Sequence, residues 1–323
     1  FKRLYDEQGP TEFLGHHQET ARSRVVCLVQ EGERVEEATA DQVVDVITTA
    51  SPFYGRAGGQ LGDTGVIRGS NGQATVVDTV KPGGSLIAHE AKIVAGRLRV
   101  GDEVSLEVDR QRRQAIRLNH SGTHLLHHAL RTVLGPHVAQ KGSEVGPDRL
   151  RFDFSHFEGL TDEQIARVEQ LVNAEIRRNL PTRIEELTLD EARKLGAMAL
   201  FGEKYGERVR VVRIGGESIE LCGGTHVERS GDIGFLRVVS DELLALGVRR
   251  IVAVTGEGAL SRDQHHDALI RRSARTLKSA AEDLDQRIQR LIGQNRDLER
   301  EIAQLKQQLA TGAGANLLDQ VRE

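Results

Sequence analysis

The chain has few residues that could cross-link it or carry it into a membrane. Only two of its 323 residues are cysteines, which leaves no disulfide framework and favours a reducing compartment. It has no run of 18 apolar residues and no signal-type start. We therefore predict a cytoplasmic protein with no membrane partner.

The chain also lacks an excess of positive charge. Lys and Arg number 44 against 48 Asp and Glu, so there is no global basic field for nucleic acid. Any RNA contact has to come from local groups of cations. The chain has two such groups, Arg110, Arg112, Arg113 and Arg117 in the first and Arg249 and Arg250 in the second. A solvated helix face explains the first group equally well.

The only methionine is Met198, and the first residue is Phe1. We therefore expect the chain to be a piece of a longer protein. Its length is too great for one small core and predicts two or three domains.

The chain does contain two spaced pairs of metal-binding side chains. His120 and His124 are four residues apart on a predicted helix, so both imidazoles project from the same face. Cys222 and His226 form the second pair, about a hundred residues later. Imidazole and thiolate are ligands that zinc prefers, and four of them satisfy its tetrahedral geometry. The sequence therefore predicts one zinc ion (Zn2+) held by these four residues.

Spacing alone leaves other histidines open as ligands, because His127 and His128 lie three and four residues after His124. A zinc protease would have glutamate where this chain has Ser121, so peptide hydrolysis would lack its base. A purely structural zinc usually has closely spaced ligands in a domain too small to fold without it. The wide separation here favours a site built into a cleft.

The pattern of apolar residues predicts an α+β fold class. After a remnant of a preceding helical or linker region (1–22), residues 23–110 carry short apolar runs separated by glycine- and aspartate-rich turns. This pattern is typical of a small antiparallel β-barrel or sandwich. Within it, Cys27 is expected to be a small buried hydrophobe, and the glycine-rich stretch 51–65 a tight loop.

Helices and strands alternate from 111 to 260, which predicts an α/β zinc-containing core. A helix is expected over 109–134, ended by Gly135-Pro136, and a capping box at Thr161 predicts a second helix. A strand ending at Leu221 would deliver Cys222.

Residues 261–323 predict a long helical segment. Leucine recurs every seven residues from Leu277 to Leu305, and a second seam runs from Ala281 to Leu309, which is typical of a coiled coil. A helical hairpin, or docking against another domain, would show the same stripe.

Several motifs closely resemble the editing domain of the alanyl-tRNA synthetase family, and they occur in that family's order. The glycine-rich stretch is similar to a motif of that family's barrel subdomain. The matching segments are 51–65, 120–127 (HSGTHLLH), 196–206 (GAMALFGEKYG), 220–226 (ELCGGTH) and 247–251 (GVRRI).

The resemblance implies hydrolysis of the ester that joins a wrong amino acid, serine or glycine, to the terminal adenosine of tRNA(Ala). It implies that His120, His124, Cys222 and His226 are the zinc ligands, and it places Thr123 and Gln140 in the editing pocket. The helical segment after 260 would begin a dimerisation domain, so a homodimer through these helices is implied as well. No adenylation domain is recognisable, so the ligase activity is not expected of this chain.

Two alternatives stay open. The first is a free-standing deacylase of mischarged tRNA, and the second is a non-catalytic binding and dimerisation fragment with a structural zinc. Departures from the family pattern affect pocket shape and fine specificity, because none is a proposed ligand. They are Gly122 in place of alanine, Ala57 in place of serine and Val252 in place of glutamate.

Overall fold

The computed structural model describes residues 1–198 and 206–320, with side chains described up to residue 310. The chain divides into two compact units, residues 1–260 and 261–323. Among the described residues, no helix combines the length and the apolar character that crossing a membrane would require.

The first unit begins with a closed six-stranded antiparallel barrel, as the sequence predicts. Its strands pair in the order β10, β7, β8, β9, β5 and β2, and β2 closes the ring by pairing with β10. The strands are β2 (Thr20–Gln30), β5 (Val43–Thr48), β7 (Gly65–Gly69), β8 (Gly72–Gly83), β9 (Leu86–Arg99) and β10 (Glu103–Val108).

Alternation of apolar and polar residues fills the barrel. In β10, Val104, Leu106 and Val108 are buried and the residues between them are exposed, as expected for a strand with one face toward a core. Three short strands, β3 (Glu33–Val35), β4 (Glu37–Thr39) and β6 (Ala50–Ser51), complete this part of the chain.

The first 22 residues pack against the barrel. Helix α1 (Lys2–Gln8) buries Leu4 in a small cluster that also contains Cys27, and β1 (Glu12–Phe13) pairs with β6. Cys27 is buried, as predicted.

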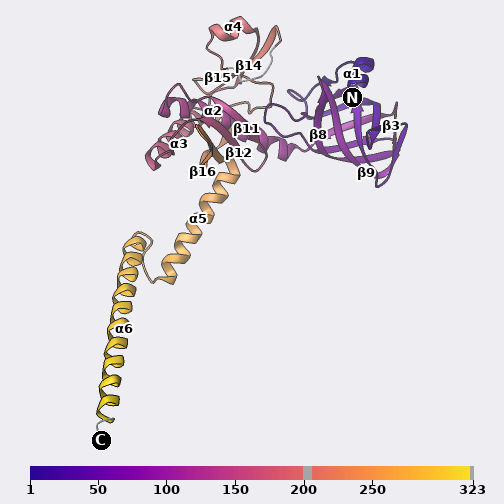
Figure 1. Ribbon diagram of the computed structural model, residues 1–323. Coiled ribbons are helices and arrows are strands. Elements are labelled where there is room, and N and C mark those ends of the chain that lie inside the picture. Colours follow the sequence, from indigo (N-terminus) through magenta and orange to yellow (C-terminus); the bar gives the residue numbers. More distant parts are fainter. Residues whose placement is uncertain (199–205, 321–323) are drawn as a thin grey trace. The chain divides into compact units, whose positions relative to one another are not determined.

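A four-stranded antiparallel sheet and two helices form the next layer, which lies beside the barrel in Figure 1. The helices α2 and α3 pack against each other and share one hydrophobic core with the sheet. The elements are α2 (Arg110–Leu134), β11 (Gln140–Val145), β12 (Leu150–Ser155), α3 (Asp162–Arg177), β16 (Leu236–Ala245) and β17 (Val248–Thr255), with a short 3-10 helix, η1 (Ser230–Ile233).

The two helices begin and end where their sequence signals predict. Asp109 caps α2 by accepting a hydrogen bond from the backbone N–H of Arg112, and Gly135 follows its last residue with a φ of 117°. Thr161 and Gln164 form the predicted capping box of α3. Since α2 carries His120 and His124, these signals fix the helix that holds the first ligand pair.

A three-stranded sheet delivers the second ligand pair. Its strands are β13 (Arg183–Thr188), β14 (Arg208–Ile214) and β15 (Ser218–Leu221), with α4 (Leu189–Lys194) after β13. Cys222 follows β15 directly, as predicted, whereas β13 is not among the predicted strands. Most of the family-like segment 196–206 lies outside the described residues.

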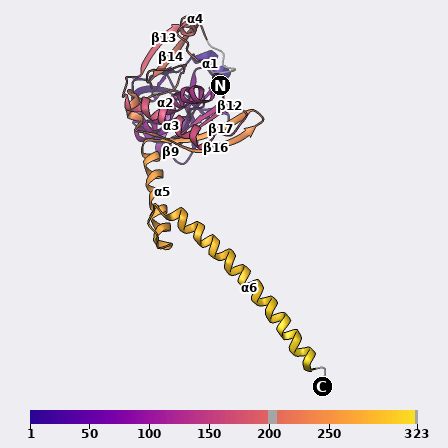
Figure 2. The ribbon, with the colours of Figure 1, turned by 90° about the vertical axis from the view of Figure 1, so that its left-hand side faces the viewer.

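In the second unit, only some of the residues that carry the heptad pattern lie on a helix. Helix α5 (Gly256–Thr276) crosses into this unit and ends before Leu277, and Lys278 has a φ of 48°. Leu277 and Ala281 therefore lie outside the helices, which corrects the predicted continuous seam. The positions from Leu284 onward lie on α6 (Leu284–Gln320), one uninterrupted helix in Figures 1 and 2.

A buried histidine in the barrel predicts how stability depends on pH. His89 is 0% exposed; its Nδ1–H donates to the carbonyl of Val46, and its Nε2 accepts from the hydroxyl of Ser51. Burial lowers the pKa of His89 to about 4, although the hydrogen bond to Val46 opposes this. A base with a depressed folded pKa stabilises the fold above its unfolded pKa of 6.5 and loses that stability as the pH falls toward 4.

We therefore expect lowering the pH from 7 to 5 to remove about 2 kcal/mol of unfolding free energy through His89. Urea unfolding of the metal-free chain measures this, with His89→Gln as the comparison because glutamine keeps a donor and an acceptor but does not titrate. The difference between the two pH profiles of unfolding free energy gives the contribution of His89 and removes that of the other histidines. Parallel profiles would contradict the prediction.

Candidate metal centre

The structure brings the two ligand pairs together. His120, His124, Cys222 and His226 each offer one ligand atom, and these atoms lie within 4.8 Å of one another. The sulfur of Cys222 lies 3.5 Å from Nε2 of His120 and 3.3 Å from Nε2 of His226. Nitrogen and sulfur ligands of a tetrahedral zinc ion are about 3.5 Å apart, so this donor set fits the metal.

The remaining imidazole nitrogens face polar groups on three different segments. Nδ1 of His120 lies 2.8 Å from Oε1 of Gln60, in the barrel's glycine-rich loop. Nδ1 of His226 lies 3.2 Å from the hydroxyl of Ser121. Nδ1 of His124 has no hydrogen-bond partner among the described residues and lies 3.6 Å from a carboxylate oxygen of Glu220. Metal-binding histidines usually have such a partner on the nitrogen that does not bind the metal.

Burial keeps the imidazoles in the neutral form that a metal ligand needs. It lowers the pKa of His120 and of His226 well below 6.5, and neighbouring imidazoles lower both further. Burial also lowers the pKa of His124, which Glu220 partly opposes. For Glu220 itself burial raises the pKa, but His124 and His127 outweigh burial and lower it, so an anion lies beside the ligands.

A half-buried guanidinium shapes the turn that carries Cys222. Nη1 of Arg210 donates to the carbonyls of Cys222, at 2.7 Å, and Gly224, at 3.0 Å. A Cβ on Gly224 would lie 2.1 Å from the ring of His120 and 2.8 Å from Oε1 of Gln60. Only glycine lets this turn approach α2 so closely.

A cavity of about 310 Å³ opens onto these ligands. Thr123 and Gln140 both line it, together with His120, His124 and Cys222. The hydroxyl of Thr123 donates to the carbonyl of Asn119, so its oxygen can still accept a hydrogen bond. The side-chain amide of Gln140 donates to the hydroxyl of Ser143, which also lines the cavity. Thus every residue predicted for the site belongs to one cluster. His226 contributes its ligand atom to that cluster but lines a second cavity and not this one.

Sequence reasoning missed two residues of this centre, Gln60 and Glu220. Both lie within segments that the family resemblance singled out, but no spacing in the sequence marks either of them as a neighbour of the histidines. His127, which spacing left open as a ligand, instead lies 3.0 Å from Glu220 and packs against Phe152. Its contact with Glu220 was not visible in the pattern because 93 residues separate them.

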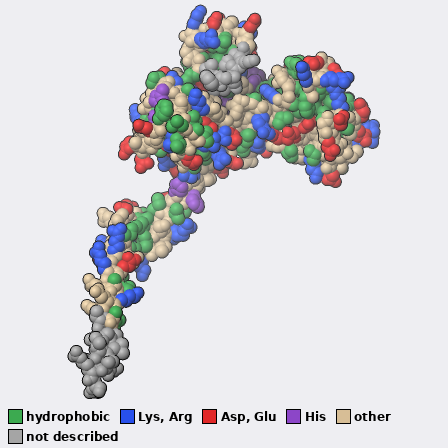
Figure 3. All heavy atoms as spheres, viewed as in Figure 1, with side chains coloured by type: hydrophobic (Ala, Val, Ile, Leu, Met, Phe, Trp, Pro, Cys, Tyr) green, Lys and Arg blue, Asp and Glu red, His purple; other side chains and the backbone are tan. Residues whose placement is uncertain are grey.

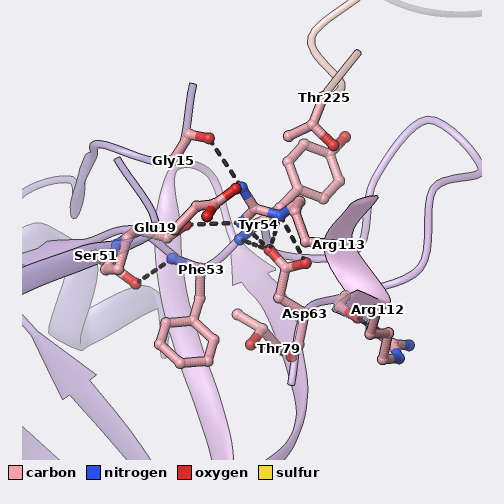
Figure 4. A network of polar contacts seen from close by, with 12 residues as sticks. Gly15, Glu19, Ser51, Phe53, Tyr54, Asp63, Thr79, Arg112, Arg113 and Thr225 are labelled. Atoms are coloured by element: carbon pink, nitrogen blue, oxygen red, sulfur yellow. Dashed lines mark hydrogen bonds and ion pairs between the residues drawn. The ribbon is translucent and has the colours of Figure 1, made fainter. Parts of the chain in front are cut away.

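A buried ion pair attaches α2 to the barrel (Figure 4). The guanidinium of Arg113, which is 0% exposed, binds both carboxylate oxygens of Asp63 and also donates to the carbonyls of Gly15 and Pro52. Asp63 also accepts the backbone N–H of Tyr54, at 2.6 Å. The glycine-rich loop is therefore held at the N-terminal half of α2.

The structure rules out one of the candidate RNA-binding arginines, Arg113, and gives the others partners within the chain. Arg113 is buried, Arg249 binds Asp241 through two nitrogens, and Arg250 binds Asp153 in the same way. Arg112 donates to the carbonyl of Gly62, while Arg110 and Arg117 pair with Glu19. On the face of residues 1–260 that Figure 3 shows, cationic and acidic side chains are mixed in the same way.

Two tRNA synthetase families match parts of the chain. Residues 1–112 match the tRNA synthetases class II (A), and residues 209–252 match the threonyl and alanyl tRNA synthetase second additional domain. The second match contains Cys222 and His226, and the first contains the barrel and the beginning of α2.

Nearly the whole chain is similar to alanine–tRNA ligases. It is 50% identical to that of Paramagnetospirillum magneticum over 96% of this chain, and 48% identical to that of Paracoccus denitrificans over 99%. The ligase of Parvibaculum lavamentivorans is 47% identical. The chain spans only 36% to 37% of the length of these relatives.

The buried ion pair should dominate the attachment of α2 to the barrel. Replacing Arg113 by methionine leaves the Asp63 carboxylate buried without its partner, which should cost about 3–5 kcal/mol. We expect the melting temperature to fall by roughly 10 °C. Arg110→Met is the matched control, because its exposed side chain pairs with Glu19 only at 3.4 Å. Equal shifts for the two variants would show that the buried pair has no special role.

Proposed function

Because nearly the whole chain is homologous to a segment of alanine–tRNA ligases, we propose that it is an editing module that hydrolyses the aminoacyl ester of mischarged tRNA(Ala). Its substrates are tRNA(Ala) molecules that carry serine or glycine. The observation that supports this best is the cavity in which Thr123 and Gln140 adjoin a His3Cys donor set. We propose that it acts in the cytoplasm, where aminoacylated tRNA is used.

The chemistry of the two amino acids explains why a second site is needed. Serine differs from alanine by one hydroxyl, and an apolar pocket discriminates poorly against an isostere that adds only a hydroxyl. A pocket that binds this hydroxyl can select serine instead. Thr123 supplies an acceptor, and Gln140 and Ser143 supply both donors and acceptors on the same wall.

We propose that His120, His124, Cys222 and His226 hold one zinc ion at the inner end of this cavity. Zinc in such a position can polarise a carbonyl, activate water or orient the substrate. The protein's part is to hold three neutral imidazoles and a thiolate in place. Arg210 contributes by fixing the turn between Cys222 and Gly224, and its positive charge favours the thiolate.

We expect the chain to release serine from Ser-tRNA(Ala) and to leave Ala-tRNA(Ala) largely intact. Cys222→Ala should lower the rate by at least about a hundredfold, because it removes a zinc ligand from a site that needs the metal. The matched control is Cys27→Ala, because Cys27 is the only other cysteine and lies in the barrel.

Deacylation of labelled aminoacyl-tRNA, together with the zinc content of each protein, measures both effects. If Cys222→Ala loses zinc but keeps its rate, the metal is structural. If the zinc-loaded chain releases no serine, the non-catalytic tRNA-binding alternative replaces the enzymatic one.

We also propose that cations at the cavity bind the backbone of the tRNA acceptor end. Lys81 and Arg208 both line the cavity, and neither forms an ion pair with another residue in the described parts of the chain. Arg208 donates one hydrogen bond to the carbonyl of Glu186. Lys81 lies 5.4 Å from the centre of the Tyr54 ring, and burial lowers its pKa. These are the local positive charges that an acidic chain needs for RNA.

Replacing Lys81 or Arg208 by glutamine should weaken tRNA binding and lower the slope of log affinity against log salt by about 1 for each phosphate that the variant no longer neutralises. Binding titrations at several salt concentrations measure this. Lys92→Gln is the control, because Lys92 is an exposed barrel lysine that pairs with Asp41. The proposal fails if all three variants keep the slope of the unmodified chain.

The helical unit is proposed to support a homodimer. Apolar side chains on α6 are exposed at heptad positions, such as Leu298 at 57% and Leu305 at 50%, and a partner helix would cover them.

A further inference from the structure

The glycine-rich loop of the barrel reaches the proposed metal centre through one side chain. Gln60 is 0% exposed, and its backbone is held between the loop and the sheet. Leu61 donates to the carbonyl of Val145 on β11, and Val145 donates to the carbonyl of Gly59. The side chain of Gln60 therefore projects from a fixed backbone and not from a mobile loop tip.

The amide of Gln60 makes three hydrogen bonds that define its orientation. Its Nε2 donates to the hydroxyl of Thr225, at 3.0 Å, and its Oε1 accepts the backbone N–H of Thr225, at 2.9 Å. Because a backbone N–H can only donate, the atom 2.8 Å from Nδ1 of His120 must be the amide oxygen. An amide oxygen can only accept, so Nδ1 of His120 carries the proton.

This proton assignment determines which nitrogen of His120 can bind a metal. With Nδ1 protonated, the lone pair of a neutral imidazole is on Nε2, the nitrogen that lies 3.5 Å from the sulfur of Cys222. Gln60 thus selects the tautomer and the ring orientation that direct a donor toward the other ligands.

Two glycines make this approach feasible. Gly59 has a φ of 83°, and a Cβ there would lie 2.3 Å from the hydroxyl of Ser143. A Cβ on Gly224 would collide with both His120 and Gln60. The barrel loop and the turn after Cys222 are therefore both built to let one amide lie between His120 and Thr225.

We propose that Gln60 is a positioning residue of the metal centre, which makes the barrel's glycine-rich loop a part of that centre. This inference rests on the proposed zinc site but not on the deacylase activity. Gln60 does not touch the metal; it acts through His120.

Zinc affinity is the decisive measurement, obtained by competition between the full chain and a chromophoric chelator. Gln60→Met removes the acceptor while keeping the length of the side chain, and should weaken zinc binding by about 10- to 100-fold. Gln60→Glu keeps an acceptor for Nδ1–H of His120 and should restore affinity to within a few-fold of the unmodified chain.

Thr225→Val tests whether Gln60 acts by orienting His120 or only by holding the glycine-rich loop against the turn after Cys222. It removes the hydrogen bond from Gln60 to the Thr225 hydroxyl but keeps the bond to His120. Its zinc affinity should stay close to that of the unmodified chain. The inference is overturned if Gln60→Met binds zinc normally, or if Thr225→Val weakens binding as much as Gln60→Met does.

A measurement on the unmodified chain covers the case in which Gln60→Met does not fold. In the metal-free chain, nitrogen NMR of the imidazoles should find His120 protonated on Nδ1, with His120→Gln identifying its signals. Protonation on Nε2 overturns the inference. A chain that binds zinc as expected but hydrolyses no aminoacyl-tRNA contradicts the proposed function and leaves the role of Gln60 intact.

Discussion

The site depends on the buried ion pair between Asp63 and Arg113. Asp63 is three residues after Gln60 in the glycine-rich loop, and Arg113 is seven residues, about two helical turns, before His120 on α2. Positions seven apart lie on the same face of a helix, so the pair and the Gln60–His120 hydrogen bond form two parallel contacts between one loop and one helix. The ion pair fixes the position of the loop along the helix. The hydrogen bond between Gln60 and His120 can therefore be short.

This arrangement explains why the proposed ligands are so far apart in sequence. Each segment is held by structure of its own: α2 by its cap and the shared core, the loop by Arg113 and β11, and the turn after β15 by Arg210. Three neutral imidazoles can then be buried together without a metal having to organise the fold. Such a centre differs from a small zinc module, in which the metal supplies most of the folding energy.

Local signals made much of this predictable, and long-range contacts account for the rest. The i,i+4 spacing of His120 and His124 and the cap at Asp109 are properties of single segments, so the sequence reveals them. Gln60 and Glu220 contact histidines 60 and 93 residues away, and no periodicity records such pairings. The roles of Thr123 and Gln140 came from family resemblance alone, and their shared cavity is consistent with them.

The local groups of arginines in the sequence do not show which of these residues have acidic partners in the fold. The chain has slightly more acids than bases, but its carboxylates are not spread evenly among its arginines. Asp63, Asp153 and Asp241 hold guanidiniums that stabilise the fold, whereas the cavity keeps cations without carboxylate partners in the described parts of the chain. If the proposed RNA binding holds, the positive charge left at the cavity is the part of this balance that a phosphate backbone would meet there.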